Sequence, residues 1–146
     1  MADEFRPPAT DDEWRAYHDI RRHVLFERRG RGALYDPNRP DEHLATNHPH
    51  IFLHDREPVG VIRVDIAGDT AIFRLVAIRE PLQRRGYGRR MLESAEGFAI
   101  AEGAVRVESH VAVEAVGFYE RCGFRCVEPP RAGAQTVLMT KPLAAR

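Results

Sequence analysis

The middle of the chain constrains the fold most, because it alternates between the patterns of a strand and of a helix. Thr70–Ile78 is a nearly continuous run of apolar residues, which is typical of a strand buried on both faces. After Gly88, apolar residues recur at helical spacing as far as Gly103, a residue type that commonly ends a helix. Val105–Val111 then has the pattern of a second strand. We therefore expect a strand, a helix and a strand in succession.

The flanking segments add helices and strands on both sides of this unit. The capping-box sequence TDDE at Thr10–Glu13 predicts a first helix that runs to about Glu27. Further apolar and β-branched runs predict strands at Ile51–His54, Val59–Ile66, Phe124–Val127 and Thr136–Thr140, and a helix at Glu114–Arg121. Residues 28–43, which are rich in glycine and proline, are predicted to form a loop.

The order of these elements sets the fold class. A helix and antiparallel strands are followed by strand–helix–strand–helix–strand–strand, which predicts an α/β (α+β) fold with a mixed sheet. At 146 residues, with 43% hydrophobic and 30% charged residues, the chain has the composition of an ordinary globular domain. We therefore expect a single domain over residues 1–146.

Charge and hydropathy exclude several classes of partner. The chain has 22 basic (Lys and Arg) and 22 acidic (Asp and Glu) residues, so no net field attracts nucleic acid or an anionic membrane. No apolar run approaches the roughly 18 residues that a membrane span needs, and the acidic N-terminus is unlike a signal peptide. Cys122 and Cys126 are too few for a disulfide framework. These features predict a cytoplasmic protein that binds neither nucleic acid nor a membrane.

The turn that opens the second predicted helix has the character of an anion site. The first N–H groups of a helix lack internal acceptors, and the helix dipole adds partial positive charge there. Gly86 and Gly88 allow the backbone to approach a bulky ligand. Arginines that can make forked contacts to phosphate surround them: Arg84, Arg85, Arg89 and Arg90. No lysine follows the glycines, and Met91 stands where a dinucleotide-binding motif has its third glycine, so both common nucleotide-binding motifs are disfavoured.

Two stretches resemble motifs of the GNAT acyltransferase superfamily. QRRGYG (Gln83–Gly88) resembles the family's pyrophosphate-binding motif Q/R-x-x-G-x-G/A, and LVAI (Leu75–Ile78) before it is similar to the family's fourth strand. AVGFYERCGF (Ala115–Phe124) resembles the signature A-x-x-F-Y-x-x-x-G-F. Each motif lies on the element that it needs and in the family's order, so the resemblance is specific over Thr70–Val127.

The resemblance implies acetyl-coenzyme A (acetyl-CoA) as co-substrate, on a GNAT-like domain whose mixed central sheet has splayed fourth and fifth strands and is flanked by helices. The pantetheine arm is then expected to pair with the backbone of Val76, Ala77 and Ile78, as an added strand does. The pyrophosphate is expected to rest mainly on main-chain N–H groups of the turn, with contacts from Gln83, Arg84, Arg85, Gly86, Tyr87, Gly88 and Arg89.

Acyl transfer to an amine needs a neutral amine, donors for an oxyanion and a proton for the leaving thiolate. By resemblance, Tyr119 supplies that proton and a main-chain N–H near Val76–Ile78 serves the oxyanion. The fourth strand has no carboxylate, although many relatives carry one there. Arg106, Glu108 and His110 share one face of their strand, so Glu108 or His110 is a candidate base. The alternative is that Glu108 only pairs with Arg106 or another surface arginine.

Four histidines crowd one region of the sequence: His43, His48, His50 and His54. Their spacing fits no common zinc pattern and no cysteine lies near, so we expect no metal. In the family this part of the chain often shapes the acceptor pocket. The resemblance therefore makes His48, His50 and Phe52 candidates for contact with the acceptor.

We therefore expect an acetyl-CoA-dependent N-acetyltransferase that acts on a primary amine of a small molecule or a protein. The alternative is a non-catalytic sensor that binds acyl-CoA through the same turn but lacks an effective base. Nucleic-acid binding is a poor third interpretation, because no basic stripe with interleaved aromatic residues is present. Many family members form homodimers, and no feature of the sequence decides whether this chain does.

Overall fold

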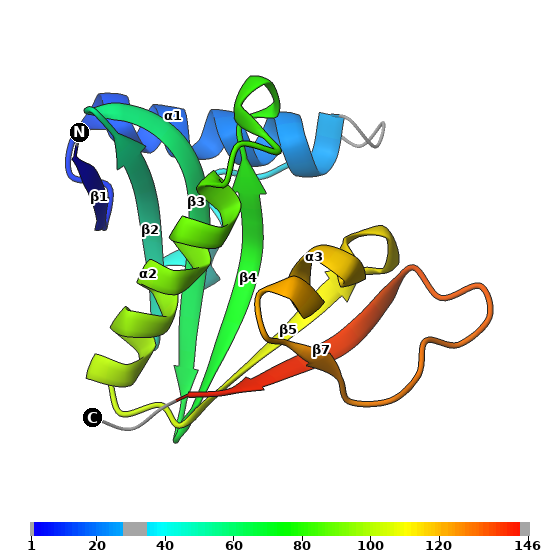
Figure 1. The fold of residues 1–146 in the computed structure, drawn as a ribbon. Helices are drawn as coiled ribbons and strands as arrows, with labels where there is room; N and C mark the ends of the chain where they lie inside the picture. Colours follow the sequence, from blue (N-terminus) through cyan, green and yellow to red (C-terminus); the bar gives the residue numbers. More distant parts are fainter. Residues whose placement is uncertain (1, 28–34, 144–146) are drawn as a thin grey trace.

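A computed structural model of the chain describes residues 2–27 and 35–143 (Figure 1). The strands are β1 (Asp3–Arg6), β2 (Asn47–His54), β3 (Glu57–Ala67), β4 (Thr70–Ile78), β5 (Arg106–Ala112), β6 (Arg125–Cys126) and β7 (Thr136–Pro142). The α-helices are α1 (Asp11–Arg21), α2 (Tyr87–Ala101) and α3 (Val116–Arg121). Shorter helical segments are the π-helix η1 (Arg22–Phe26) and the 3₁₀ turns η4 (Pro40–His43), η5 (Glu80–Leu82) and η6 (Val113–Ala115).

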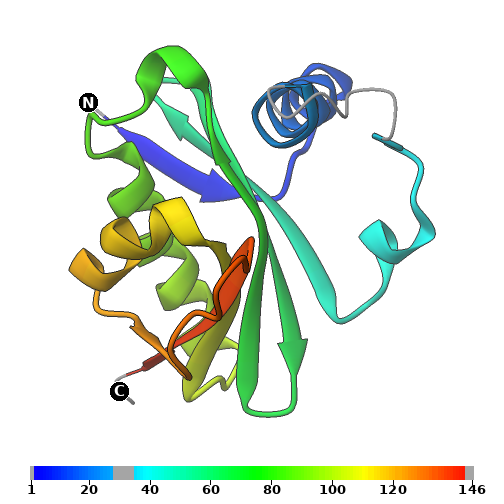
Figure 2. The ribbon, with the colours of Figure 1, turned by 90° about the vertical axis from the view of Figure 1, so that its right-hand side faces the viewer.

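The strands form one mixed sheet in the order β1-β2-β3-β4-β5-β7-β6. β4 and β5 run parallel, and the other neighbouring strands are antiparallel. α1 lies on one face of the sheet, and α2 and α3 lie on the other (Figure 2). The predicted α/β (α+β) fold with a helix-flanked mixed sheet is thus confirmed. Among the described residues, no helix is long and apolar enough to cross a membrane.

The two faces of the sheet are buried under different helices, because side chains alternate along each strand. On β3, Val61 packs with Tyr17 and Ile20 of α1. Its neighbours Ile62 and Val64 belong to a larger cluster that includes the apolar stripe of α2. The central strands are therefore packed on both faces, as their near-continuous apolar sequences predicted.

The predicted capping box begins α1. The Thr10 hydroxyl accepts a hydrogen bond from the Glu13 N–H at 3.1 Å, and the Glu13 carboxylate accepts one from the Ala9 N–H at 2.8 Å. Arg6 of β1 donates two further bonds to that carboxylate, at 2.6 and 2.8 Å. The bonds from Arg6 and then from Ala9 lower the pKa of Glu13 to about 2. After α1 the chain continues as a π-helix over Arg22–Phe26, close to the predicted helix end.

β4 and β5 separate part-way along their length, as the family resemblance implied. They are paired from Thr70 opposite Arg106 to Phe73 opposite Ser109, whose hydroxyl donates to the Phe73 carbonyl oxygen at 3.0 Å. Leu75 follows with a φ of +56°, which residues with side chains rarely adopt, and the register of β4 against β3 shifts at the same place. Beyond this bulge β4 pairs with β3 alone, so one strand edge is open (Figure 1).

The observed elements differ from the predicted ones mainly where the sequence is polar. The sequence does not predict β1, because its four residues lack an apolar alternation; the Phe5 ring holds it to β2 by stacking on a histidine at 4.4 Å. β2 begins at Asn47 and not at the predicted Ile51, since its first half is polar. Of the predicted loop over residues 28–43, the part from 28 to 34 lies outside the described residues, and the last four residues form η4.

Candidate active site

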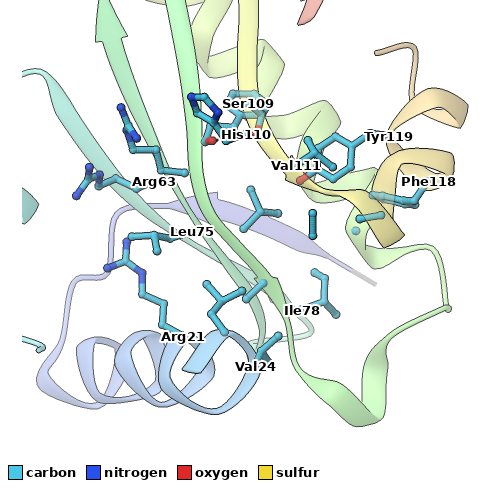
Figure 3. A pocket seen from close by; sticks show the side chains of 18 of the residues that line it. Arg21, Val24, Arg63, Leu75, Ile78, Ser109, His110, Val111, Phe118 and Tyr119 are labelled. Atoms are coloured by element: carbon cyan, nitrogen blue, oxygen red, sulfur yellow. Dashed lines mark hydrogen bonds between the residues drawn. The ribbon is translucent and has the colours of Figure 1, made fainter. Parts of the chain in front are cut away.

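A large cavity opens where β4 and β5 separate. Its volume is about 1520 Å³, and it is lined by β4, β5, α3, the turn before α2 and parts of α1 and η4. Tyr119 and Phe118 lie on one side of β4, and Arg21 and Arg63 lie on the other (Figure 3). The cavity therefore joins groups that belong to opposite faces of the sheet.

The open edge of β4 forms one wall of this cavity. Directly after β4, Arg79 donates its N–H to the Val59 carbonyl oxygen of β3 at 2.8 Å. Because hydrogen-bonding directions alternate along a strand, Ala77 also points its backbone groups toward β3, whereas Val76 and Ile78 point theirs toward the cavity. Ala77 therefore lines the cavity without offering the predicted backbone contact.

The turn between η5 and α2 presents main-chain N–H groups that have no acceptor. The first bond of the helical turn runs from the Arg90 N–H to the Gly86 carbonyl oxygen at 3.2 Å. Within the described ranges, no protein atom is recorded as accepting from the N–H groups of residues 84–89. Arg84 and Gly86 have φ values of +65° and +87°, and left-handed residues are typical of backbone concavities that bind anions. The predicted anion site is thus open.

The two glycines of the turn have different roles. A Cβ at Gly86, where φ is +87°, would have no neighbour within 4 Å and would meet open space. A Cβ at Gly88 would lie 3.1 Å from Cζ of Phe118 and 3.7 Å from Cγ1 of Ile78. The backbone conformation therefore requires glycine at position 86, and the close packing of α2 on α3 and β4 requires it at position 88.

The arginines of the turn divide between the cavity and the protein surface. Arg84 and Arg89 line the cavity, whereas Arg85 does not. Arg90 donates two hydrogen bonds to the Asp3 carboxylate, at 2.9 and 2.8 Å, and these bonds raise the pKa of its guanidinium. Arg90 therefore ties α2 to β1 in place of the expected contact with phosphate.

Gln83 and Tyr87 stabilise the turn with their side chains. The Gln83 Nε2 donates to the Ile78 carbonyl oxygen at 2.9 Å. The Tyr87 ring packs against His54, with 5.4 Å between ring centroids, and lies 4.8 Å from the Arg90 guanidinium. Because the Tyr87 side chain does not line the cavity, its expected contact with a ligand is through its main-chain N–H.

Tyr119 lies in the cavity wall with only 7% of its surface exposed. Its ring packs edge-on against Phe118 and Phe124, with 5.5 and 5.3 Å between centroids. Burial raises the pKa of the Tyr119 phenol and the Cys122 thiol adds to this rise, while a hydrogen bond with the Ser109 side chain opposes it. The phenol therefore keeps its proton at neutral and moderately alkaline pH.

The two candidate bases differ in position. His110 lines the cavity and is exposed. Glu108 lies opposite Ile72 of β4, in the part of the sheet where β4 and β5 are still paired, and does not line the cavity. Nor does Glu108 pair with any arginine of the described residues; Arg106 Nη1 lies 2.8 Å from the Asp69 carboxylate instead. The geometry therefore supports neither expectation for Glu108, because the strands separate only beyond it.

The α1 side of the cavity holds a charge cluster that the sequence analysis does not predict. We call it the arginine cluster, and its members are Arg21, Glu42, Arg63, Asp65 and Arg74. The Glu42 carboxylate lies 2.7 Å from Arg21 Nη1 and 3.3 Å from Arg63 Nη1. Arg63 donates to Asp65 at 2.8 and 2.9 Å, and Arg74 Nε donates to Asp65 at 2.8 Å. All but Arg74 are buried.

These contacts determine how Glu42 behaves. Burial opposes its ionisation, but Arg21 and hydrogen bonds from Tyr17, at 2.5 Å, and Arg63 hold the pKa of Glu42 below its usual value. Glu42 is therefore a partner of arginines and a poor base. One signal in the sequence marks the cluster: the RVD of β3 puts two charges among residues 58–67, which are otherwise uncharged.

The clustered histidines face away from the cavity. His48 and His50 pack against Phe98 of α2, with 5.2 and 4.5 Å between ring centroids, and Phe52 is buried in the same core. The prediction that His48, His50 and Phe52 contact the acceptor is therefore wrong, because β2 turns these side chains toward α2. In the part of the chain that the structure describes, no group of His, Cys, Asp and Glu side chains is arranged to hold a metal ion.

Comparison with known proteins agrees with this architecture. The model of the acetyltransferase (GNAT) family matches residues 8–124, which include the turn, the open strand edge and Tyr119. The chain belongs to the GNAT acetyltransferase family. The features of this family member that lie in the cavity can therefore be interpreted as parts of an acetyltransferase fold.

Relatives of this GNAT protein are found among bacterial proteins and solved structures. It is 30% identical over 126 residues to "Putative acetyltransferase BSU40680" of Bacillus subtilis (strain 168), a match that covers 84% of this chain and 85% of that protein. The crystal structure of a "putative N-acetyltransferase" from Lactobacillus plantarum superposes with a TM-score of 0.80 at 28% identity, over 99% and 100% of the two chains. The paia N-acetyltransferase from Thermoplasma acidophilum, solved in complex with coenzyme A, shares the fold, with a TM-score of 0.72 at 15% identity. The match covers 97% of this chain and 99% of that protein.

Proposed function

We propose that this GNAT protein is a single-domain N-acetyltransferase, which transfers the acetyl group of acetyl-CoA to a primary amine of a small molecule or a protein. The observation that carries the proposal is the row of main-chain N–H groups at residues 84–89, which lacks acceptors among the described residues. Residues of this turn line the same cavity as the open edge of β4. A diphosphate suits the first feature, and an extended amide chain suits the second.

The turn suits the charged part of the coenzyme. α2 begins at Tyr87, directly behind the N–H groups, so its dipole adds partial positive charge. Arg84 and Arg89 line the cavity beside them and can donate to phosphate oxygens. Gly86 leaves open space for the ligand, since among the described residues no atom beyond its own chain neighbours lies within 4 Å of the position of its missing Cβ.

The edge of β4 suits the pantetheine arm. Val76 offers both its N–H and its C=O toward the cavity by the alternation of strand hydrogen bonds. Ile78 offers chiefly its N–H, because Gln83 already donates to its carbonyl oxygen. We infer that the arm pairs with these two residues and not with Ala77.

Acetyl-CoA supplies the activated acetyl thioester, and the chain's own residues manage the protons. The buried Tyr119 phenol is our candidate donor to the departing thiolate. Its raised pKa keeps that proton in place over the pH range in which an amine acceptor becomes neutral. We propose that exposed His110 accepts a proton from the amine, directly or through water. Of the Val76 and Ile78 N–H groups, the one that the arm does not use is the candidate donor to the developing oxyanion.

Calorimetric titration with acetyl-CoA tests the first half of this proposal. We expect saturable binding at one site, whereas the absence of binding would remove both the enzyme and the alternative acyl-CoA sensor. Release of free thiol, measured with a panel of amines, tests the second half. An enzyme releases thiol in proportion to acetylated amine, whereas a sensor binds acetyl-CoA and releases none.

A further inference from the structure

The arginine cluster carries more positive than negative charge. Its buried members are two arginines, Arg21 and Arg63, and two carboxylates, Glu42 and Asp65, so the extra positive charge is that of the half-exposed Arg74. Arg74 shares the Asp65 carboxylate with Arg63, so among the described residues it has no carboxylate of its own. An anion bound in the adjoining cavity would remove this imbalance.

Two arginines of the cluster also have donors left over. Arg21 is 4% exposed; its Nη atoms bond Glu42 and the Tyr17 hydroxyl, but its Nε has no hydrogen-bond partner among the described residues. A buried donor without an acceptor costs about 1–3 kcal/mol. Among the described residues, Arg74 makes one hydrogen bond, from its Nε to Asp65, and its side chain is 44% exposed in the cavity wall. Its Nη groups are therefore available to a ligand.

We propose that the arginine cluster binds a carboxylate on the acceptor, which makes the acceptor an amino acid or another amine that bears a carboxylate. The inference rests on the proposed function and names the substrate class for the same cavity. A carboxylate carries one negative charge, which balances the cluster, and its two oxygens match the planar fork of a guanidinium. A phosphate, with a charge near −2, would overshoot this balance.

The alternative of a polycationic acceptor is disfavoured by the same contacts. Glu42 and Asp65 are already paired with arginines, so neither is free to bind an ammonium group. Asp36 and Glu114 also line the cavity, but both are exposed to solvent. A neighbouring arginine cluster also disfavours a protonated amine, which favours the neutral form that attacks the thioester.

The cluster lies on the acceptor side of the cavity. Arg21 and Arg63 are on the α1 side of β4, opposite Tyr119 and Phe118 (Figure 3). The turn at residues 84–89 precedes α2, which covers the other face of the sheet (Figure 2). The coenzyme and a carboxylate-bearing amine can therefore enter from opposite faces and meet at the gap between β4 and β5.

Matched acceptors and one matched pair of variants test this inference. The acceptors are ω-amino acids from glycine to 6-aminohexanoate, each compared with the amide of the same chain length, with a diamine and with an aminoalkylphosphonate. The variant is Arg74→Gln, which leaves Asp65 paired with Arg63 and so retains the buried core of the cluster. The control is Arg106→Gln, because Arg106 is also 44% exposed and also lies 2.8 Å from an aspartate, yet does not line the cavity.

We expect the best amino acid to exceed its amide by about 10–100-fold in kcat/KM, as charged hydrogen bonds of about 1.5–3 kcal/mol predict. Arg74→Gln should remove most of this difference by raising KM for the amino acid, with little change in kcat or in the Kd of acetyl-CoA. Arg106→Gln should change none of these values. Equal use of amino acids and amides, or a preference for the diamine or the phosphonate, would overturn the inference.

A second titration separates this inference from the proposed function. The N-acetylated amino acid is titrated into the protein without coenzyme, so this measurement does not depend on acetyl-CoA binding. We expect wild type to bind it at least tenfold more tightly than Arg74→Gln does. Equal affinities would overturn the carboxylate site even if acetyl transfer is observed, whereas a wild-type protein that binds the carboxylate but not acetyl-CoA would refute the proposed function alone.

Discussion

A negative charge at position 86 tests the diphosphate site, and Gly103 provides a matched control. Gly86 and Gly103 stand just before and just after α2, with φ values of +87° and +91°, and neither has a neighbour within 4 Å of the Cβ position. Substitution by Glu therefore imposes similar backbone strain of about 1–2 kcal/mol at each position. We expect Gly86→Glu and Gly103→Glu to lower Tm by similar amounts, and only the first to weaken coenzyme binding.

The expected loss follows from Coulomb's law. A carboxylate about 6 Å from a diphosphate repels each unit charge by roughly 1.5–3 kcal/mol at an effective dielectric constant of about 20–40. Screening by salt reduces the summed repulsion from the two charges to about 3 kcal/mol of binding free energy, which corresponds to roughly a hundredfold rise in the Kd of acetyl-CoA. Gly86→Gln adds nearly the same volume and strain without the charge, so it should weaken binding much less than Gly86→Glu does.

The assay is calorimetric titration of each variant with acetyl-CoA at two salt concentrations, with Tm measured alongside. Higher salt should reduce the difference in the Kd of acetyl-CoA between Gly86→Glu and Gly86→Gln, because this difference is electrostatic. The reasoning fails if Gly86→Glu binds acetyl-CoA as tightly as Gly103→Glu does. It also fails if Gln and Glu at position 86 raise the Kd of acetyl-CoA equally, since a steric block alone would then explain the loss of binding.

Four further predictions concern proton transfer and stability. Tyr119→Phe should lower kcat by about 100-fold with an unchanged Kd for acetyl-CoA, whereas Tyr87→Phe should alter neither; a raised Kd in Tyr119→Phe would indicate a packing role. Because burial raises the pKa of Tyr119, activity should not decline between about pH 8 and pH 10, and a fall in kcat/KM there would contradict its role as proton donor. His110→Ala should lower kcat/KM by about 10–100-fold for a weakly basic acceptor, and an unaffected rate would eliminate it as the base. The pKa of Glu13 is lowered from 4.5 to about 2, so its carboxylate stabilises the fold above pH 4.5 and loses this effect as the pH falls toward 2. In denaturant titrations, Glu13→Gln should therefore lower the free energy of unfolding by about 1 kcal/mol at pH 7 and leave it unchanged near pH 2. The control Asp12→Asn, at an exposed position, should leave the free energy of unfolding unchanged at both pH values.

The helices, the strands and the turn at residues 84–89 could be predicted because their signals are local in the sequence. β4 has the predicted bounds Thr70–Ile78, since its apolar run is bordered by turn residues on both sides. The row of N–H groups at residues 84–89 belongs to one continuous segment, so the glycine pattern and the helix start suffice to predict it. The α/β (α+β) class follows from the order of such local signals.

The arginine cluster could not be predicted, because it depends on how distant segments of the chain meet. Arg21, Glu42 and Arg63 come from α1, η4 and β3, and no pattern in the sequence joins them. The family resemblance makes His50 a candidate for acceptor contact, but it does not show which helix covers that face of the strand, and His50 lies under α2. The candidate base Glu108 fails for a similar reason, since the point at which β4 and β5 part depends on a bulge in the register.

We propose that the main-chain N–H groups of residues 84–89 bind the coenzyme's diphosphate. The most direct test of this proposal is the change in amide chemical shifts of ¹⁵N-labelled protein on titration with coenzyme A and, separately, with pantetheine, which lacks the diphosphate. We predict that the largest changes with coenzyme A fall on the amides of residues 84–89 and are absent with pantetheine, which should still shift Val76 and Ile78. Amides 84–89 that stay unchanged at saturating coenzyme A, or that respond equally to pantetheine, would contradict the account.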